Sequence, residues 1–300
     1  MIMSLLLRCF WKIPIDFCML NVLVTGASGF VGKHLVQRLS SMANVDSVYQ
    51  HSSALSDISK EYSLASFLNK KISIVFHLGG KTFVPESWNN PYDYFNTNIN
   101  GTLNVLEYCR IENARLVYLS SYLYGNSIIP TSEREAVKTN NPYSASKHLA
   151  EHLIKKYIDL YGVDATIIRP FNLFGAGQSE SFLIPELFRK IKSDQSTIEI
   201  LDDVPKRDYL HIDDFIDFLV LLISQNLNET FNVGSGESFS VVELALEIMQ
   251  LLGVKKNIKV IGQSRKNEIL ETRADISKAK SQLSWTPKLS LMEGLERSMQ

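Results

Sequence analysis

The chain has 300 residues and is 45% hydrophobic, enough to bury a substantial core in one large domain or two lobes. Its formal net charge is −1, with no basic stripe or charged tail, which argues against nucleic acid and against an electrostatic membrane partner. The cysteines, Cys9, Cys18 and Cys109, imply no disulfide framework. A reducing cytoplasm is therefore the expected compartment.

Residues 1–18 are apolar but interrupted by Arg8, Lys12 and Asp16. The segment is too short and too charged to span a bilayer, and it lacks the features of a signal peptide. Met19 stands just before the first predicted strand. We therefore expect Met19 to be the natural start and residues 1–18 to be a non-native or disordered extension.

A glycine-rich turn follows the first apolar run, Val22–Val24, and a helical pattern follows the turn. The N-terminus of such a helix has unpartnered N–H groups and a positive dipole, so it attracts anions. Glycines at 26, 29 and 32 allow a tight turn and a close approach of backbone to a pyrophosphate. A dinucleotide site is the prediction.

A nucleotide triphosphatase loop is the nearest rival, because Gly32-Lys33 looks like its ending. That loop requires Gly at position 27 and Ser or Thr at position 34. The chain has Ala27 and His34, which excludes it.

The second strand is predicted near residues 45–50, and it ends in Tyr49-Gln50-His51-Ser52-Ser53 without a carboxylate. NAD-binding folds place an acid there for the ribose hydroxyls, so its absence favours NADP. No Arg follows, however, and only Lys33 and His34 are available instead. A solvated Lys33 is the plainer interpretation.

The third strand is predicted to follow almost at once, at Ala54–Ile58, with Asp57 beside the adenine or capping a helix. The run from Ile72 is predicted to be the fourth strand, because it is apolar enough to be buried on both faces. Gly79 and Gly80 at its end allow a ligand to approach, and His77 is interpreted as a packed residue.

Two later segments carry polar groups to the same region. A helix after Pro91 holds Asn98 in an apolar face, and a strand over 115–121 ends in hydroxyls. A helix over 141–161 then places Tyr143 and Lys147 on one face. An ammonium near a phenol lowers the pKa of the phenol, which suits proton transfer beside a nicotinamide.

The chain resembles the extended short-chain dehydrogenase/reductases, in the group of nucleotide-sugar epimerases, dehydratases and reductases, over about residues 20–295. The motifs that carry the resemblance are Thr-Gly-x-x-Gly-Phe-x-Gly at 25–32, Phe-His-Leu-Gly-Gly at 76–80, Asn-x-Asn-Gly-Thr at 98–102, Ser-Ser-x-x-Tyr-Gly at 120–125, Tyr-x-x-x-Lys at 143–147, Arg-Pro-Phe-Asn at 169–172, Lys-Arg-Asp-Tyr-Leu-His-Ile-Asp-Asp at 206–214, Ala-Asp-Ile-Ser-Lys-Ala from 274 and Trp-x-Pro ending at 287.

The resemblance implies a Rossmann doubly wound parallel sheet at 19–170, with 171–300 mainly a smaller α/β substrate lobe interleaved with it. It implies Ser120, Tyr143 and Lys147 as the catalytic residues, counting Ser120 back from Tyr124-Gly125. The implied cofactor residues are Gly26, Ser28, Gly29, Phe30, Val31, Gly32, Asp57, Ile58, Leu78, Gly79, Gly80, Asn98, Tyr143 and Lys147. The implied substrate residues are Lys81, Ser120, Ser121, Asn172, Arg207 and Arg265, with Arg207 on the diphosphate. No metal is implied.

The reaction is narrowed by the two positions after Ser120. Dehydratases of the family place Asp and Glu there, whereas this chain has Ser121 and Tyr122, which excludes that chemistry. A C4 ketoreductase of a nucleotide-activated 4-keto-6-deoxyhexose, using NADPH, is favoured by the missing acid at the second strand and by the loop 175–179. An NAD-dependent UDP-sugar 4-epimerase is the alternative.

A catalytically inactive scaffold relative is a further class, disfavoured because such proteins tend to lose the Tyr or Lys, and both are present. The helices predicted at 91–112 and 143–161 carry apolar residues beyond one core face. The family dimerises through such helices, so a homodimer is expected.

Removal of residues 1–18 is predicted to leave the melting temperature and the activity unchanged, because no predicted core strand precedes Leu20. Thermal unfolding of the trimmed and full chains tests this, and a large loss of melting temperature on trimming would show that the extension is structural.

Overall fold

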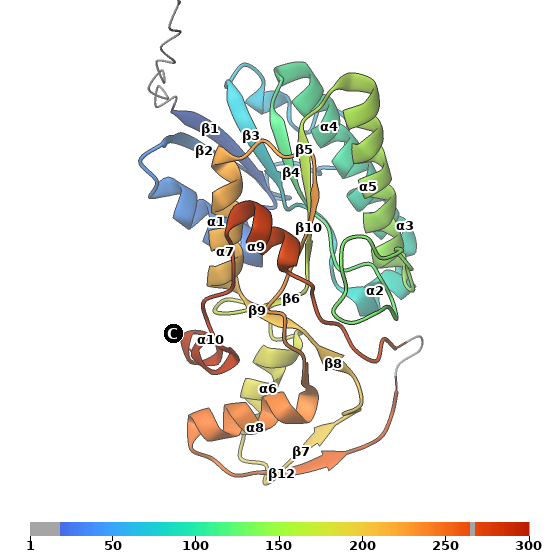
Figure 1. Cartoon of the computed structure of the whole chain (residues 1–300), viewed down its shortest axis with the longest axis vertical. Coiled ribbons are helices and arrows are strands. Elements are labelled where there is room, and N and C mark those ends of the chain that lie inside the picture. The colour runs from blue at the N-terminus through green and yellow to red at the C-terminus, as the bar shows by residue number, and fades with distance from the viewer. Residues whose placement is uncertain (1–18, 265–267, 300) are drawn as a thin grey trace, which may run out of the picture.

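A computed structural model describes residues 19–264 and 268–299 and shows two lobes stacked end to end (Figure 1). The larger lobe is a parallel sheet with helices on both faces, and the smaller lobe mixes helices with short strands. The predicted doubly wound α/β fold is confirmed. The predictions for residues 1–18 and for Arg265 lie outside the described residues.

The main sheet has six strands in the order β10-β5-β4-β3-β1-β2, and neighbouring strands run parallel. Its strands are β1 (Leu20–Thr25), β2 (Val45–His51), β3 (Ile72–His77), β4 (Arg115–Leu119), β5 (Ala165–Pro170) and β10 (Thr230–Val233). Their carboxyl ends point toward the smaller lobe (Figure 1), which is the edge where open parallel sheets bind ligands.

Alternating residues of each strand face two separate hydrophobic layers. Val22 and Val24 pack with one set of helices and Leu23 packs with the other, so the strand is apolar throughout. The first layer is covered by α1 (Phe30–Ser40), α7 (Ile212–Leu221) and α9 (Ser277–Leu283), and the second by α4 (Gly101–Glu112) and α5 (Pro142–Tyr161).

The connection from β3 to α4 is built from short helical pieces. They are α2 (Val84–Asn89), α3 (Pro91–Phe95) and a π-helical turn (Asn96–Asn100), while single 3₁₀ turns lie at Ala65–Phe67 and Leu222–Ser224. π-Helical turns are frequent at functional sites because they re-aim one side chain. Here the turn contains Asn98, which is 1% exposed.

The smaller lobe has its own core, in which Leu187, Ile198 and Ile248 are among the buried side chains. Its elements are α6 (Leu183–Lys192), α8 (Val241–Leu252) and α10 (Leu291–Arg297), with the strand pairs β6 (Asn172–Phe174) and β9 (Tyr209–His211), β7 (Thr197–Ile200) and β12 (Asn257–Val260), and β8 (Lys206–Arg207) and β11 (Phe239–Ser240). A capping box of Ser240 and Glu243 opens α8, and Gly253 ends it in a left-handed conformation.

The two lobes are interleaved in sequence. After β6 the chain builds α6 and β7, and then returns to the larger lobe for α7, β10 and α9 (Figure 1). The lobes also touch through an aromatic pair. Phe83, before α2, packs edge to face against Phe182, before α6, with ring centroids 6.2 Å apart.

The predicted third strand is wrong. Ala54–Ile58 forms turns and no strand, because the carbonyl of Ser52 accepts the N–H groups of Leu55 and Ser56. Ile72–His77, predicted as the fourth strand, is therefore the third strand of the chain.

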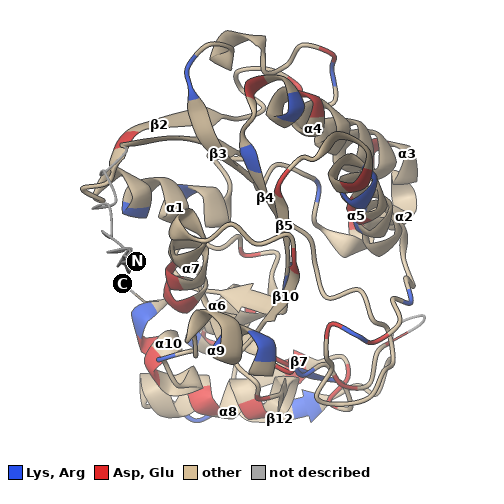
Figure 2. Cartoon of the chain, turned by 45° about the horizontal axis from the view of Figure 1, so that its top comes forward, with Lys and Arg blue, Asp and Glu red and all other residues tan. Residues whose placement is uncertain are grey.

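Charges of both signs are interspersed along the helices in Figure 2, in keeping with the net charge of −1. None of the helices in the described ranges combines the length and the apolar character needed to cross a membrane.

Candidate active site

The glycine-rich turn between β1 and α1 is shaped by backbone contact with the end of β3. Gly26 has a φ of +69°, and a Cβ atom there would lie 2.7 Å from the backbone nitrogen of Gly79. Gly29 is the N-cap of α1 and makes no side-chain hydrogen bond, and the first turn of α1 has no acidic residue. The predicted positions 28–32 thus lie at a helix N-terminus that carries neither a side-chain cap nor an acidic residue, which is the kind of position that attracts anions.

His77 holds this turn against the neighbouring strands. Its ring nitrogens lie 2.7 Å from Thr25 Oγ1 and 3.2 Å from Thr102 Oγ1, and the backbone N–H of Gly79 also donates to Thr25 Oγ1. Burial, with smaller contributions from the charges of Lys147 and His51, lowers the pKa of His77 to about 3. His77 is therefore neutral and packed, as predicted.

Asn98 clamps the loop that follows β3. Its Oδ1 accepts the backbone N–H of Lys81 at 2.9 Å, and its Nδ2 donates to the carbonyl of Lys81 and to Ser146 Oγ at 3.1 and 2.8 Å. A Cβ atom at Gly80 would lie 2.7 Å from Asn98 Oδ1, so only glycine fits there. Asn98 thereby fixes the path of Leu78–Lys81 beside α5.

Lys147 lies beneath this loop and is 3% exposed. Its Nζ donates to the carbonyl of Leu119 at 2.7 Å and lies 4.9 Å from the ring centroid of Tyr118. Burial lowers the pKa of Lys147 to about 8, while the charge of Glu151 acts in the opposite direction.

Tyr143 opens α5 one turn before Lys147, and its ring packs edge to face on Tyr94 with centroids 6.5 Å apart. Burial raises the pKa of Tyr143 to about 12, although a hydrogen bond from Ser121 lowers it. The sequence predicted that Lys147 would lower this pKa. In the structure the ammonium is directed to the carbonyl of Leu119, and burial dominates.

The two serines after β4 point in different directions. Ser120 is 3% exposed and donates to Glu151 Oε1 at 2.6 Å, whereas Ser121 contacts Tyr143. This differs from the predicted register, in which Ser120 faces the substrate and Ser121 lies one residue beyond. The strand pleat is the reason, because Ser120 shares a face with Tyr118, which packs toward α5.

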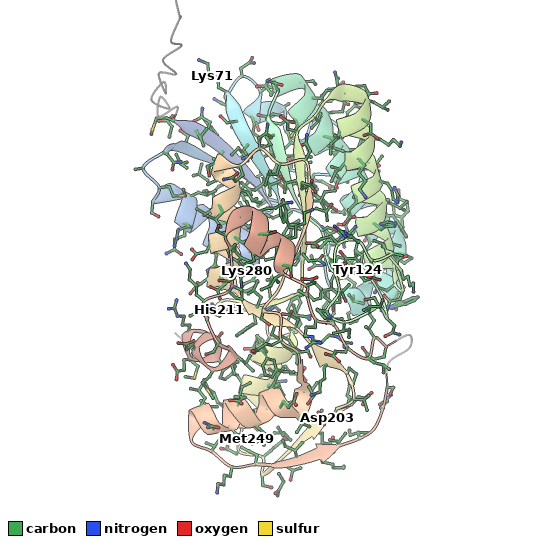
Figure 3. The ribbon with its side chains drawn as sticks, in the orientation of Figure 1. Lys71, Tyr124, Asp203, His211, Met249 and Lys280 are labelled. Atoms are coloured by element: carbon green, nitrogen blue, oxygen red, sulfur yellow. The ribbon has the colours of Figure 1, made fainter. Side chains whose placement is uncertain are left out.

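A buried ion pair lies behind Ser120 and was missed from the sequence. Arg169 on β5 donates to both oxygens of Glu151, at 2.9 and 2.5 Å, and to Tyr124 Oη at 2.7 Å. Tyr124 in turn donates to Asn232 Oδ1, and Figure 3 places Tyr124 at the end of the sheet that faces the smaller lobe. The available signal was the spacing of Glu151, four residues after Lys147 on the same helix.

Asn172 lies across from these groups, at the start of β6. Its Oδ1 accepts the hydroxyl of Tyr122 at 3.3 Å, and its Nδ2 donates to the carbonyl of Asp208 at 3.1 Å. The Tyr122 ring stacks on Phe171 with centroids 5.3 Å apart. A tyrosine side chain therefore occupies the position where a dehydratase would need a carboxylate.

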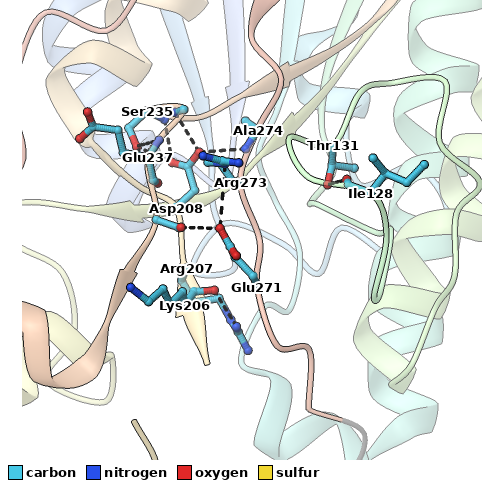
Figure 4. A network of polar contacts seen from close by, with 12 residues as sticks. Ile128, Thr131, Lys206, Arg207, Asp208, Ser235, Glu237, Glu271, Arg273 and Ala274 are labelled. Atoms are coloured by element: carbon cyan, nitrogen blue, oxygen red, sulfur yellow. Dashed lines mark hydrogen bonds and ion pairs between the residues drawn. The ribbon is translucent and has the colours of Figure 1, made fainter. Parts of the chain in front are cut away.

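Arg207 is positioned by its neighbour Asp208, whose carboxylate accepts the backbone N–H groups of Ser235, Gly236 and Ala274 (Figure 4). Asp208 thus joins three segments of the chain. The Arg207 guanidinium, with a side chain 16% exposed, is ion-paired with Glu268. The structure therefore pairs the predicted diphosphate ligand, Arg207, with a carboxylate of the same chain.

Three other predicted ligand residues have contacts within the protein. Asp57 is exposed and accepts the N–H and hydroxyl of Ser59 at 3.0 and 2.8 Å, while Ile58 is buried in the second layer. The ammonium of Lys81 lies 3.7 Å from Glu86 and 3.5 Å from Asp93.

At the end of β2, His51 is buried against Ser56 Oγ at 2.8 Å, and Gln50 is exposed. His51 is thus directed into the protein and away from a ribose site. Within the described ranges, no cluster of three or more His, Cys, Asp or Glu side chains could hold a metal ion.

Comparisons with known proteins agree with this geometry. The profile of the NAD dependent epimerase/dehydratase family matches residues 22–234. GDP-6-deoxy-D-talose 4-dehydrogenase of Aggregatibacter actinomycetemcomitans is 34% identical over 251 residues, covering 79% of this chain and 83% of that protein.

Two solved structures have the same fold. RMD from Pseudomonas aeruginosa, complexed with NADPH, has a TM-score of 0.83 and 27% identity, covering 93% of this chain and 97% of that one. UDP-glucose 4-epimerase from Thermotoga maritima, with UDP-glucose, has a TM-score of 0.83 and 26% identity, with coverages of 93% and 97%.

Replacing Asn98 by alanine is predicted to lower the free energy of unfolding by about 2–3 kcal/mol, because buried partners on Lys81 and Ser146 lose their hydrogen bonds. Asn100→Ala is the matched control, since Asn100 is exposed and its side chain donates to Asn96 Oδ1 at the surface. A change below about 0.5 kcal/mol is expected. Urea denaturation measures both, and equal losses would contradict the clamp.

Proposed function

Because the chain belongs to the NAD dependent epimerase/dehydratase family, we propose that it reduces the C4 keto group of a nucleotide-activated 4-keto-6-deoxyhexose. The observation that carries the proposal is a half-buried tyrosine with a raised pKa, Tyr143, beside a serine hydroxyl and one helical turn from a buried lysine. The relative from Aggregatibacter supports the substrate class, because its name describes a 4-dehydrogenase of a GDP-6-deoxy sugar.

Tyr143, Ser121 and Lys147 have different roles in the proposed reduction. Bound NADPH supplies the hydride that the sugar C4 receives. Tyr143 donates its phenolic proton to the C4 oxygen, and Ser121 donates a hydrogen bond to the same oxygen. Lys147, as an ammonium, holds the ribose hydroxyls of the cofactor and offsets the negative charge left on Tyr143.

Ser121 takes the serine role in this proposal in place of Ser120. The hydroxyl of Ser120 is already committed to Glu151 at 2.6 Å in a buried position, and that of Ser121 contacts the proton donor. The exclusion of a dehydratase is unaffected, because Tyr122 and Leu123 follow Ser121 and neither is acidic.

Tyr143 carries the proton that the reduced C4 oxygen would need. Burial raises the pKa of Tyr143 to about 12, so the phenol of the protein without ligand is protonated at neutral pH.

The substrate is proposed to lie between the two lobes. Asn172 offers an amide beside Tyr122, and Arg207 offers a guanidinium fork to the diphosphate, where it would exchange Glu268 for the ligand.

NADPH is the proposed cofactor. The β2 end, Gln50 to Ser53, holds no carboxylate to repel a 2′-phosphate. The NADPH complex of the structural neighbour from Pseudomonas supports this choice.

A UDP-sugar 4-epimerase is the second candidate, supported by the fold shared with the Thermotoga enzyme. A homodimer is also proposed, because α4 and α5 present exposed apolar side chains. Ile111, Leu149 and Leu160 are 60%, 46% and 68% exposed.

Incubation with GDP-, dTDP- and UDP-linked 4-keto-6-deoxyhexoses and NADPH is predicted to give the 4-hydroxy sugar, with NADPH used at least as well as NADH. Mass spectrometry and NMR of the product measure this. Interconversion of a UDP-hexose by protein that retains NAD through purification would instead establish the epimerase.

Single-turnover reduction is predicted to separate the three hydroxyls. Tyr143→Phe lowers the rate by about 10²–10⁴, and Ser121→Ala by about 10²–10³. Ser120→Ala, the matched control, lowers it by less than about tenfold, because one hydrogen bond to Glu151 is lost. A larger effect of Ser120→Ala than of Ser121→Ala would restore the register predicted from the sequence.

A further inference from the structure

We propose that Glu151 is a positioning residue of the active site. Its charge acts on Lys147, and its hydrogen bond with Ser120 holds the end of β4. Arg169 keeps the carboxylate of Glu151 in place. The geometry stands by itself, whereas the role given to Lys147 rests on the proposed function. Nothing in the proposed proton transfer uses Glu151 directly, although it is fully buried at 0% exposure.

Lys147 and Glu151 share one face of α5. Lys147 and Glu151 are four residues apart on α5, so they lie one above the other on the side that faces the sheet. Both are buried, at 3% and 0% exposure. Water therefore screens their charges weakly.

Two hydrogen bonds join α5 to the end of β4. Lys147 donates to the carbonyl of Leu119, the last residue of β4, and Ser120, directly after the strand, donates to Glu151. Leu119 and Ser120 are thus bonded to successive turns of α5. The following residue is Ser121, so these two hydrogen bonds set where Ser121 lies relative to Tyr143.

Arg169 supplies the positive charge that pairs with Glu151. Arg169 bonds both carboxylate oxygens of Glu151 from β5, and Tyr124 and Asn232 complete the chain of hydrogen bonds behind it. A buried carboxylate requires such a partner. Glu151 is therefore a fixed negative charge that faces Lys147 from its own helix.

The other ionisable groups around Lys147 do not supply this charge. On β3, His77 is neutral because burial lowers its pKa to about 3. On β4, the Tyr118 ring lies 4.9 Å away, and burial raises its pKa well above the usual value. On α5, Tyr143 keeps its proton, and Arg169 on β5 is positive.

The sign of the effect follows. Burial lowers the pKa of Lys147 to about 8 and Glu151 raises it, so the ammonium form is lost as pH rises through that value. Without the Glu151 charge, the loss begins at lower pH. Ribose binding by Lys147 then weakens at a lower pH as well.

The test is the pH dependence of NADPH affinity, read by fluorescence titration without any sugar substrate. In Glu151→Gln the alkaline fall in affinity is expected to move down by about one pH unit. Glu107→Gln, which breaks the exposed pair of Glu107 with Arg110, is the matched control and is expected to leave the profile in place. An unmoved profile in Glu151→Gln overturns the proposal.

A second variant covers the case in which Glu151→Gln does not fold. Replacing the pair together, as Glu151→Met with Arg169→Met, removes both buried charges while preserving volume, which proteins often tolerate. The same downward direction is expected, and an unmoved profile again overturns the proposal. Because the readout needs no sugar, failure to find a 4-keto substrate would count against the proposed function alone.

Discussion

The hydrogen bond from Lys147 to the carbonyl of Leu119 joins the helix that carries Tyr143 to the strand that leads into Ser121. Most of the candidate site depends on this contact, because the proton donor and its serine partner lie on elements separated by more than twenty residues of sequence. The contact is partly buried, so competition from water is reduced. The glycine turn and the Asn98 clamp fix the opposite side in the same way, by short bonds to backbone.

The local features of the fold could be predicted from the sequence. The strand before Gly26, the helix that begins near Tyr143 and the capping box at Ser240 all follow from patterns within about ten residues. The strand predicted at Ala54–Ile58 does not form, because hydrogen bonds to the carbonyl of Ser52 close turns there in spite of the apolar residues. The predicted orientation of the Ser120 side chain differs from the structure for another reason. Counting positions back from Gly125 carries no information about the pleat of β4.

Long-range contacts could not be predicted from spacing. In the sequence Arg169 is recognised only as part of the motif at 169–172. Its partner Glu151 lies 18 residues earlier on another element, so the pairing was not predicted. The pairing of Arg207 with Glu268 spans 61 residues and depends on Asp208 joining three segments. In the protein alone this carboxylate neutralises the guanidinium, so a diphosphate would gain only the difference between two anionic partners. Affinity for the nucleotide portion should therefore depend less on Arg207 than its charge suggests.

The late arrival of β10 has a consequence for the chain during synthesis. Strand β5 is buried along its whole length and borders β10, which begins only at Thr230. Until the ribosome has released that segment, β5 presents an apolar, unpaired edge to the cell, with the N–H of Ile167 lacking its acceptor on Glu229. A nascent chain stalled or truncated between β5 and β10 should thus be a preferred client of chaperones and prone to aggregate.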